Sequence, residues 1–171
     1  GLRDRSIGAD TYAYYLAFEQ VKKDSWGTVF GNLFDYLFRG LEVKDPGYDL
    51  LTKIFQIIFK DYQMFLIAIA LLFMVLMAKF IYKHSASPCT SFIVFSTLFY
   101  SFYAITGHRQ TIATALIVFW GYDLIQKRDL KKFLMVSFIA FLIHKSSLVF
   151  VPFYFLTMIP ITQLYAGICV G

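Results

Sequence analysis

Apolar residues are unevenly distributed: charged residues are scattered through residues 1–61 and become scarce from Tyr62 onward. The segment from Tyr62 to Phe80 is an almost unbroken apolar run. As a helix, a run of about 19 residues extends roughly 28 Å, which is enough to cross the hydrocarbon core of a bilayer. The pattern therefore predicts a transmembrane helix over residues 62–82.

Further apolar segments follow, separated by short polar turns. They predict membrane helices over residues 89–106, 109–126, 130–143 and 147–160. The apolar part of the fourth predicted helix, Phe133 to Ile143, is only about 11 residues, or roughly 17 Å. His144 and Lys145 should therefore lie below the outer membrane surface, where polar groups line a wet cavity or are buried in protein.

Positive charge predicts the orientation of these helices. Basic residues gather at the end of the first helix and between the third and fourth: Lys79, Lys83, Lys127, Arg128, Lys131 and Lys132. Two predicted helices separate the two loops, so the loops share a side, and the positive-inside rule makes that side cytoplasmic. Residues 1–61, the turn at 107–110 and the pair His144 and Lys145 then face outward.

The first 61 residues are amphipathic, with apolar positions at helical spacing. They predict helices over Thr11–Lys23, after a cap at Asp10, over Thr28–Phe38 and over Tyr48–Lys60. Because aromatic residues are frequent here, we expect these helices to lie on the membrane interface or to pack over the membrane helices. The predicted fold class is all-α: a polytopic transmembrane helical bundle (62–171) with an extracytoplasmic amphipathic-helical segment (1–61).

The composition agrees with a membrane protein. Of 171 residues, 58% are hydrophobic and 16% are charged, whereas soluble domains carry about 25% charged residues. The net charge of +5 lies in short loops between apolar segments, where the positive-inside rule explains it. We therefore expect membrane lipids as partners, and no nucleic acid.

The two ends and the cysteines add little chemistry. The chain begins with Gly1 rather than Met and stops in apolar sequence at Gly171. No signal peptide precedes Arg3, and we expect both natural ends to be missing. Cys89 and Cys169 lie far apart, and neither a zinc site nor a disulfide scaffold is predicted. Because GxSxG, HExxH, Walker and paired acidic motifs are absent from the sequence, we expect no metal and no cofactor.

Three polar segments on the outward side are candidates for chemistry. In the first, Arg3 and Arg5 precede a glycine turn. A predicted helix then begins after Asp10, with Tyr12 in its first turn. Arginine offers a donor fork that suits a diphosphate, and backbone N–H groups at a helix start add to it. The alternative is that both arginines flank the membrane, paired with Asp4 and Asp10. Spacing alone does not separate the two interpretations.

The second segment is His108-Arg109-Gln110, a positive turn on the outer side, where topology does not favour positive charge. Arg109 stands at the amino end of a predicted membrane helix whose dipole attracts an anion, and we expect its guanidinium to face an outward cavity. The alternative is an arginine that extends to lipid headgroups. The general rule that charges within membranes are functional favours a site.

The third segment is His144-Lys145. Its imidazole can exchange protons near neutral pH, and its ammonium can hold a phosphate. The alternative is a buried histidine that is hydrogen-bonded to a neighbouring helix. The aromatic stretch from Tyr100 to Tyr103 could stack on sugars, although aromatic residues are also typical of membrane interfaces.

Three segments together resemble the EpsG family of bacterial exopolysaccharide-synthesis membrane proteins, within the Wzy-like polysaccharide polymerases. They are Gly1 to Tyr12, then Asp45-Pro46-Gly47-Tyr48-Asp49-Leu50-Leu51, and then Arg109-Gln110-Thr111-Ile112-Ala113 followed by Ile139 to Ser147. The resemblance extends from Gly1 to about Leu156. Asp45 stands where the family pattern leads us to expect glutamate, and this substitution keeps a carboxylate.

The resemblance implies a multi-pass enzyme of the bacterial cytoplasmic membrane, a glycosyltransferase that polymerises polyprenyl-diphosphate-linked oligosaccharide repeat units at its outer face. Other polysaccharide-assembly proteins are implied as partners. The implied catalytic residues are His144 or Asp10, which assist the attacking sugar hydroxyl, and Arg109, which holds the diphosphate together with Arg3 and Arg5. The remaining implied substrate-binding residues are Tyr12, Asp45, His108, Gln110 and Lys145.

Two other functions remain open. A transporter of lipid-linked saccharides would use the same basic cavity to bind its cargo without chemistry. A membrane acyltransferase would use His144 as its base. Growth of glycan chains in vesicles supplied with lipid-linked repeat units outside would indicate a polymerase, and movement without growth would indicate a transporter.

Overall fold

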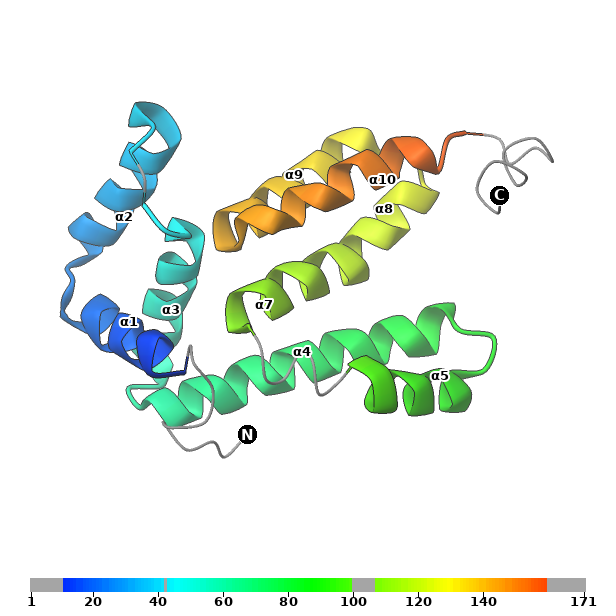
Figure 1. The fold of residues 1–171 in the computed structure, drawn as a ribbon, viewed down its shortest axis with the longest axis horizontal. Coiled ribbons are helices and arrows are strands. Elements are labelled where there is room, and N and C mark those ends of the chain that lie inside the picture. Colours follow the sequence, from blue (N-terminus) through cyan, green and yellow to red (C-terminus); the bar gives the residue numbers. More distant parts are fainter. Residues whose placement is uncertain (1–10, 42, 100–106, 160–171) are drawn as a thin grey trace.

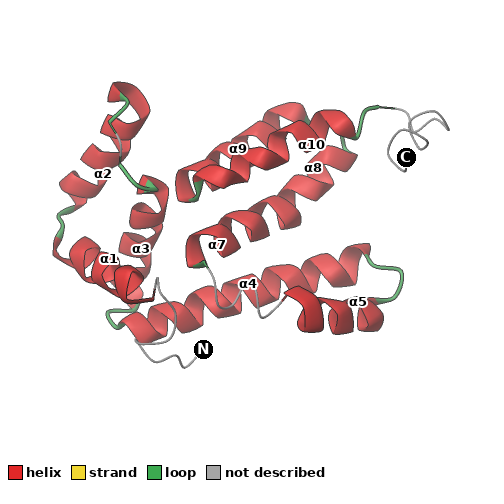
Figure 2. Cartoon of the chain, in the orientation of Figure 1, coloured by secondary structure: helices red, strands yellow, loops and turns green. Residues whose placement is uncertain are grey.

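The computed structural model describes residues 11–41, 43–99 and 107–159, and within these ranges the chain is helical, without strands (Figures 1 and 2). The elements in chain order are α1 (Thr11–Lys23), α2 (Trp26–Phe34), the π-helical turn η1 (Asp35–Arg39), α3 (Pro46–Ile58), α4 (Tyr62–His84), α5 (Pro88–Val94), η2 (Phe95–Phe99), α7 (His108–Leu116), η3 (Ile117–Gly121), α8 (Tyr122–Gln126), α9 (Leu130–Ile143), the 3-10 turn η4 (Lys145–Val149) and α10 (Phe150–Leu156). The predicted all-α fold class is confirmed.

The helix α4 is the one element in the described part of the chain that is long and apolar enough to cross a membrane. It has 23 residues and begins at an Asp61 cap, where the carboxylate accepts from the backbone N–H groups of Gln63 and Met64. The elements α7, η3 and α8 form one continuous helix with a π-helical turn in its middle (Figure 1). Crossing of the membrane by the other helices stays a prediction.

The core lies where α4, α7 and α9 run together. The helix α7 packs against both α4 and α9, and Phe65 of α4 and Ala140 of α9 are fully buried in one apolar cluster with Ile112 of α7. A bundle of this kind fixes the amino end of α7 and the carboxyl end of α9 next to each other.

The helices α1 and α3 pack over the Tyr62 end of α4, which agrees with one of the two placements expected for residues 1–61. Phe18 of α1 and Tyr48 of α3 lie against Phe65, with ring centroids 5.2 and 6.3 Å away. The ammonium of Lys53 donates to the carbonyls of Val21 and Asp24 and so closes the carboxyl end of α1.

Two of the predicted helix starts in this segment are wrong by two residues. The helix α2 begins at Trp26 instead of residue 28 because the Ser25 hydroxyl caps it, accepting from the backbone N–H of Thr28. The helix α3 begins at Pro46 instead of residue 48 because proline is suited to the first helical position, where no N–H is needed.

Candidate functional site

The motif Asp45-Pro46-Gly47 brings α3 against the carboxyl end of α9. A Cβ atom added to Gly47 would lie 2.7 Å from the backbone of Leu142, so only glycine allows this approach. Asp45 has φ 52° and ψ 58°, in the left-handed region that residues with a Cβ seldom occupy. Strain of this type is typical of functional positions.

The carboxylate of Asp45 does not cap the helix that it precedes. Instead its Oδ2 accepts a hydrogen bond from Nη1 of Arg109, at 2.9 Å across 64 residues of sequence. Both residues are buried, with 6% and 8% of their surfaces exposed. A buried ion pair of this kind holds the start of α3 to the start of α7.

Arg109 lies between two aromatic rings instead of facing an open cavity. Its guanidinium carbon is 5.3 Å from the ring centre of Tyr14 and 4.9 Å from that of Tyr48. Its Nε has no hydrogen-bond partner among the described residues. The expectation of a guanidinium that faces an outward cavity is therefore wrong, because the pairing with Asp45 and the cover from α1 and α3 enclose it.

His144 ends α9 in an extended conformation and points at the same carboxylate. Its Nδ1 lies 3.8 Å from Oδ2 of Asp45, beyond hydrogen-bond length but within reach of strong electrostatic attraction. Asp45 thus lies between a permanent cation, Arg109, and a titratable base. Aspartate beside imidazole favours the tautomer with its proton on Nδ1 and stabilises the imidazolium when it forms.

A pocket of about 410 Å³ opens beside this carboxylate. Its lining residues are Val43, Lys44, Asp45, His144 and Lys145. Neither lysine forms an ion pair with a carboxylate in the part of the chain that the structure describes. The ammonium of Lys145 lies 5.6 Å from the ring centre of Tyr36 in η1. Two unneutralised cations, an imidazole and a buried carboxylate therefore surround one hollow, which suits a negatively charged ligand.

Asp49, one turn after Asp45 on α3, is perturbed by this environment. Burial raises the pKa of Asp49 to about 6, the charge of Arg109 opposes the rise, and the charges of Asp24 and Asp45 add to it. Burial also raises the pKa of the Tyr48 phenol far above its ordinary value, so Tyr48 stays protonated beside Arg109.

Sequence reasoning missed two residues at this site. Lys44 is one of the charged residues scattered through residues 1–61, and its position next to Asp45 was the signal that could have identified it as a site residue. Asp49 lay within the quoted family motif without a role, in the first turn of the helix that Asp45 precedes.

The structure does not bring all of the predicted site residues together. Arg3, Arg5, Asp10 and the Tyr100 to Tyr103 stretch lie outside the described residues. Tyr12 and Gln110 are exposed and do not line the pocket. His108 packs edge-on against Tyr14, with ring centroids 5.1 Å apart, and so forms part of the cover over Arg109.

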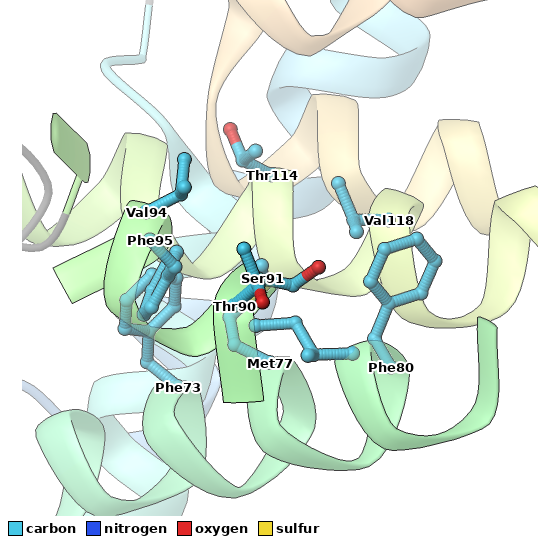
Figure 3. A pocket seen from close by; sticks show the side chains of 10 residues that line it. Phe73, Met77, Phe80, Thr90, Ser91, Val94, Phe95, Thr114 and Val118 are labelled. Atoms are coloured by element: carbon cyan, nitrogen blue, oxygen red, sulfur yellow. The ribbon is translucent and has the colours of Figure 1, made fainter. Parts of the chain in front are cut away.

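A second hollow, of about 370 Å³, lies toward the opposite end of the bundle, between α4, α5 and the middle of the α7–η3 helix (Figure 3). Its lining is apolar apart from the hydroxyls of Thr90, Ser91 and Thr114. Because no charged side chain lines it, this hollow offers no acid, base or phosphate contact.

Comparison with known proteins supports the resemblance seen in the sequence. The model of the EpsG family matches residues 1–169 of the chain. No curated protein and no solved structure matches it. The match extends over the pocket and both halves of the Asp45–Arg109 pair.

Proposed function

Because the chain belongs to the EpsG family, we propose that it is a polymerase that joins polyprenyl-diphosphate-linked oligosaccharide repeat units at the outer face of the bacterial cytoplasmic membrane. Family membership fits a role in polysaccharide assembly. We propose the reaction, the substrate and the multi-pass membrane location in addition to this role.

The observation that carries the proposal is the placement of His144 and Asp45 in one pocket with two lysines that have no carboxylate partner among the described residues. In the reaction, a sugar hydroxyl of the acceptor attacks the anomeric carbon of the donor saccharide. A new carbon–oxygen bond forms, the bond from that carbon to the diphosphate breaks, and the polyprenyl diphosphate leaves with the electron pair. His144 accepts the hydroxyl proton, and Asp45 stabilises the resulting imidazolium.

The two lysines have the complementary task. Lys44 and Lys145 line the pocket without a described counter-charge, so their ammonium groups are free to bind the diphosphate and to stabilise its charge as it leaves. In this arrangement the diphosphate contact shifts from Arg109 to the lysines.

Arg109 then acts as a positioning residue. Its Nη1 is already bonded to Asp45, and Tyr14 and Tyr48 cover its faces. Its hydrogen bond to Asp45 holds the carboxylate at 3.8 Å from Nδ1 of His144. Asp45 therefore does not need to bind substrate to affect catalysis.

The test is chain growth in proteoliposomes that contain the full-length protein and lipid-linked repeat units. We expect His144→Ala to lower the rate by about a hundredfold or more, the usual contribution of a general base. The matched control is His84→Ala at the inner end of α4, which should leave the rate within about twofold of wild type. Equal rates for His144→Ala and wild type would remove His144 as the base.

The same vesicles separate the proposal from its alternative. Lys44→Gln with Lys145→Gln should raise the KM for the lipid-linked substrate about a hundredfold or more, since each of the two charge-assisted contacts contributes about 1.5 to 3 kcal/mol. Lys23→Gln, on an exposed lysine away from the pocket, is the control. Movement of the lipid-linked saccharide across the membrane without chain growth would indicate a transporter.

A further inference from the structure

An exposed aromatic ridge runs along α2 and η1. It consists of Trp26, Phe30, Phe34 and Phe38, which recur every fourth residue, with Leu37 and Leu41 beside them. The exposed fractions of the four rings lie between 41% at Trp26 and 73% at Phe38. Large apolar side chains gathered on one face of a helix mark an interaction surface.

The ridge is built by the helix itself and does not depend on cover from the rest of the chain. Trp26 stacks on Phe30 at 6.0 Å between ring centroids, and Phe34 packs on Phe38 at 4.6 Å. Val29, on another face of α2, is buried with 2% of its surface exposed, and α2 packs against α3. One face of the helix therefore holds it to the protein, while the ridge stays free.

Contacts from η1 place the ridge at the end of α9. The ring of Tyr36 lies 6.0 Å from the ring of Phe141, one turn before His144 and inside the predicted membrane helix over 130–143. In the view of Figure 1, α3 runs across the direction of α4 at the start of α4, and α2 lies on the same side of the bundle, farther from α4. This is the level at which the predicted membrane helices leave the bilayer.

We propose that the aromatic ridge is seated in the outer leaflet of the membrane, with the lipid surface as its partner. Seated there, it would hold Tyr36 over Lys145 and fix the pocket at the depth of a lipid-linked diphosphate. The inference rests on the membrane location in the proposed function, and it is independent of the reaction.

The chemistry of the ridge favours lipid over a glycan. Aromatic platforms for sugars need polar neighbours that are free to bond to hydroxyls, whereas the charged residues that share a hollow with these rings, Asp35 and Arg39, are bonded to each other. Leucines also accompany the rings and suit acyl chains. The charged pair next to the ridge is internally neutral, since Arg39 bonds to Asp35 at 3.0 Å. The ridge therefore needs no anionic headgroup, and phosphatidylcholine should serve as well as an anionic lipid.

Quenching of Trp26 fluorescence tests the inference. The full-length protein, with Trp120 and any further tryptophan replaced by phenylalanine, is placed in nanodiscs of phosphatidylcholine with bromines at shallow or deep acyl positions. We expect shallow bromines to quench Trp26 about twofold more than deep ones, because interfacial helices enter only roughly 5 to 10 Å. Quenching by acrylamide in water with none by brominated lipid would overturn the proposal.

Two controls make the result decisive. A protein with Trp120 as its one tryptophan reports whether the bundle is in the bilayer, so its failure to respond to brominated lipid counts against the membrane location in the proposed function instead of the ridge. Phe34→Ser with Phe38→Ser should keep the wild-type melting temperature in detergent and lower lipid quenching of Trp26 about twofold. A response of Trp26 to added oligosaccharide, with no response to brominated lipid, would make the ridge a glycan platform and refute the proposal.

Discussion

The two ends of the bundle each carry an aspartate between a cation and a histidine, in different settings. At the end where α3 meets α9, Asp45 holds Arg109 and faces His144. At the other end, Asp123 of α8 bonds to Lys83 of α4 and lies 3.0 Å from Nε2 of His84. The residue types are nearly the same, so differences in behaviour come from position alone.

Burial and backbone distinguish the two clusters. The side chain of Arg109 is 10% exposed, whereas that of Lys83 is 57% exposed. Asp45 occupies a strained left-handed conformation and borders a pocket, whereas Asp123 stands in a regular helix. The Asp45 cluster has the properties of a site, while the Asp123 cluster joins two helix ends. The four predictions that follow test this contrast.

Neutralising each aspartate should give the largest difference. We expect Asp45→Asn to lower the free energy of unfolding by about 3 to 5 kcal/mol, because it leaves Arg109 buried without a counter-charge. Asp123→Asn should cost less than about 1 kcal/mol, because water and salt screen the exposed Lys83. Denaturant titration in mild detergent measures both. Equal losses would show that burial does not separate the clusters.

Gly47→Ala should be the next largest change. The added Cβ would overlap the backbone of Leu142, and overpacking typically costs about 1 to 3 kcal/mol. Since the strain also moves Asp45 away from His144, chain growth should fall by about tenfold or more. The matched control is Gly31→Ala in α2, where the added Cβ meets nothing within 4 Å. That change should raise stability by up to about 1 kcal/mol, and a rise for Gly47→Ala as well would refute the close approach.

Arg109→Lys should have a moderate effect on stability and a diagnostic effect on kinetics. Loss of the planar group between Tyr14 and Tyr48 should cost about 1 to 2 kcal/mol. A positioning residue should lower kcat and leave the KM for the lipid-linked substrate within about twofold. In the Asp123 cluster, Lys83→Arg should alter neither stability nor kinetics measurably. A raised KM with unchanged stability would return Arg109 to the role of a diphosphate ligand.

Asp49 should give the smallest effect, visible as a pH dependence. Its pKa in the folded protein is raised to about 6, so between roughly pH 4 and 6 the folded state binds a proton that the unfolded state has lost. The free energy of unfolding therefore falls as the pH rises through this range. Asp49→Asn removes this loss and should stabilise the protein by about 1 kcal/mol at pH 8, after allowance for solvent screening, with little change near pH 4.

For Asp129, in the loop before α9, the sign should be opposite. The hydrogen bond from Lys132 lowers the pKa of Asp129, so any contribution of Asp129 to stability is present above its unfolded pKa and is lost as pH falls through the lowered value. Thermal unfolding of the wild type and of Asp49→Asn, followed from pH 4 to 8, measures the difference. A wild-type profile for Asp49→Asn would show that Asp49 is ionised as easily in the folded state as in the unfolded one.

The sequence predicted helices and their order more accurately than it predicted contacts. The expected helix over 62–82 is α4, Tyr62–His84, because a long apolar run needs no partner to specify its period. The expected helices over 109–126 and 130–143 correspond to the continuous α7–η3–α8 helix and to α9. The π-helical turn η3 had no signal in the apolar pattern, since a single extra residue hardly changes the period.

The sequence identified residue types that the structure brings together, but the predicted surroundings of Arg109 were wrong. Arg109, His144 and Asp45 stood out because each was a charge or a base in an outward segment next to apolar sequence. Their pairing could not be inferred, because 64 residues separate Asp45 from Arg109. The cover by Tyr14 and Tyr48 depends on how α1 and α3 pack, and amphipathic periodicity does not specify a partner.

By itself, the sequence determined the helical fold, the membership of the EpsG family and the set of residues with chemistry to offer, since composition, periodicity and motif order are local properties. The tertiary structure alone decided that Arg109 pairs with a carboxylate, whereas Lys44 and Lys145 have no carboxylate partner among the described residues. Asp45 can pair only with a cation that lies within a few ångströms, and the close approach of Gly47 to Leu142 determines which cations lie that near. Arg109 is thereby enclosed as the partner of Asp45, and Lys44 and Lys145 remain at the pocket for a ligand.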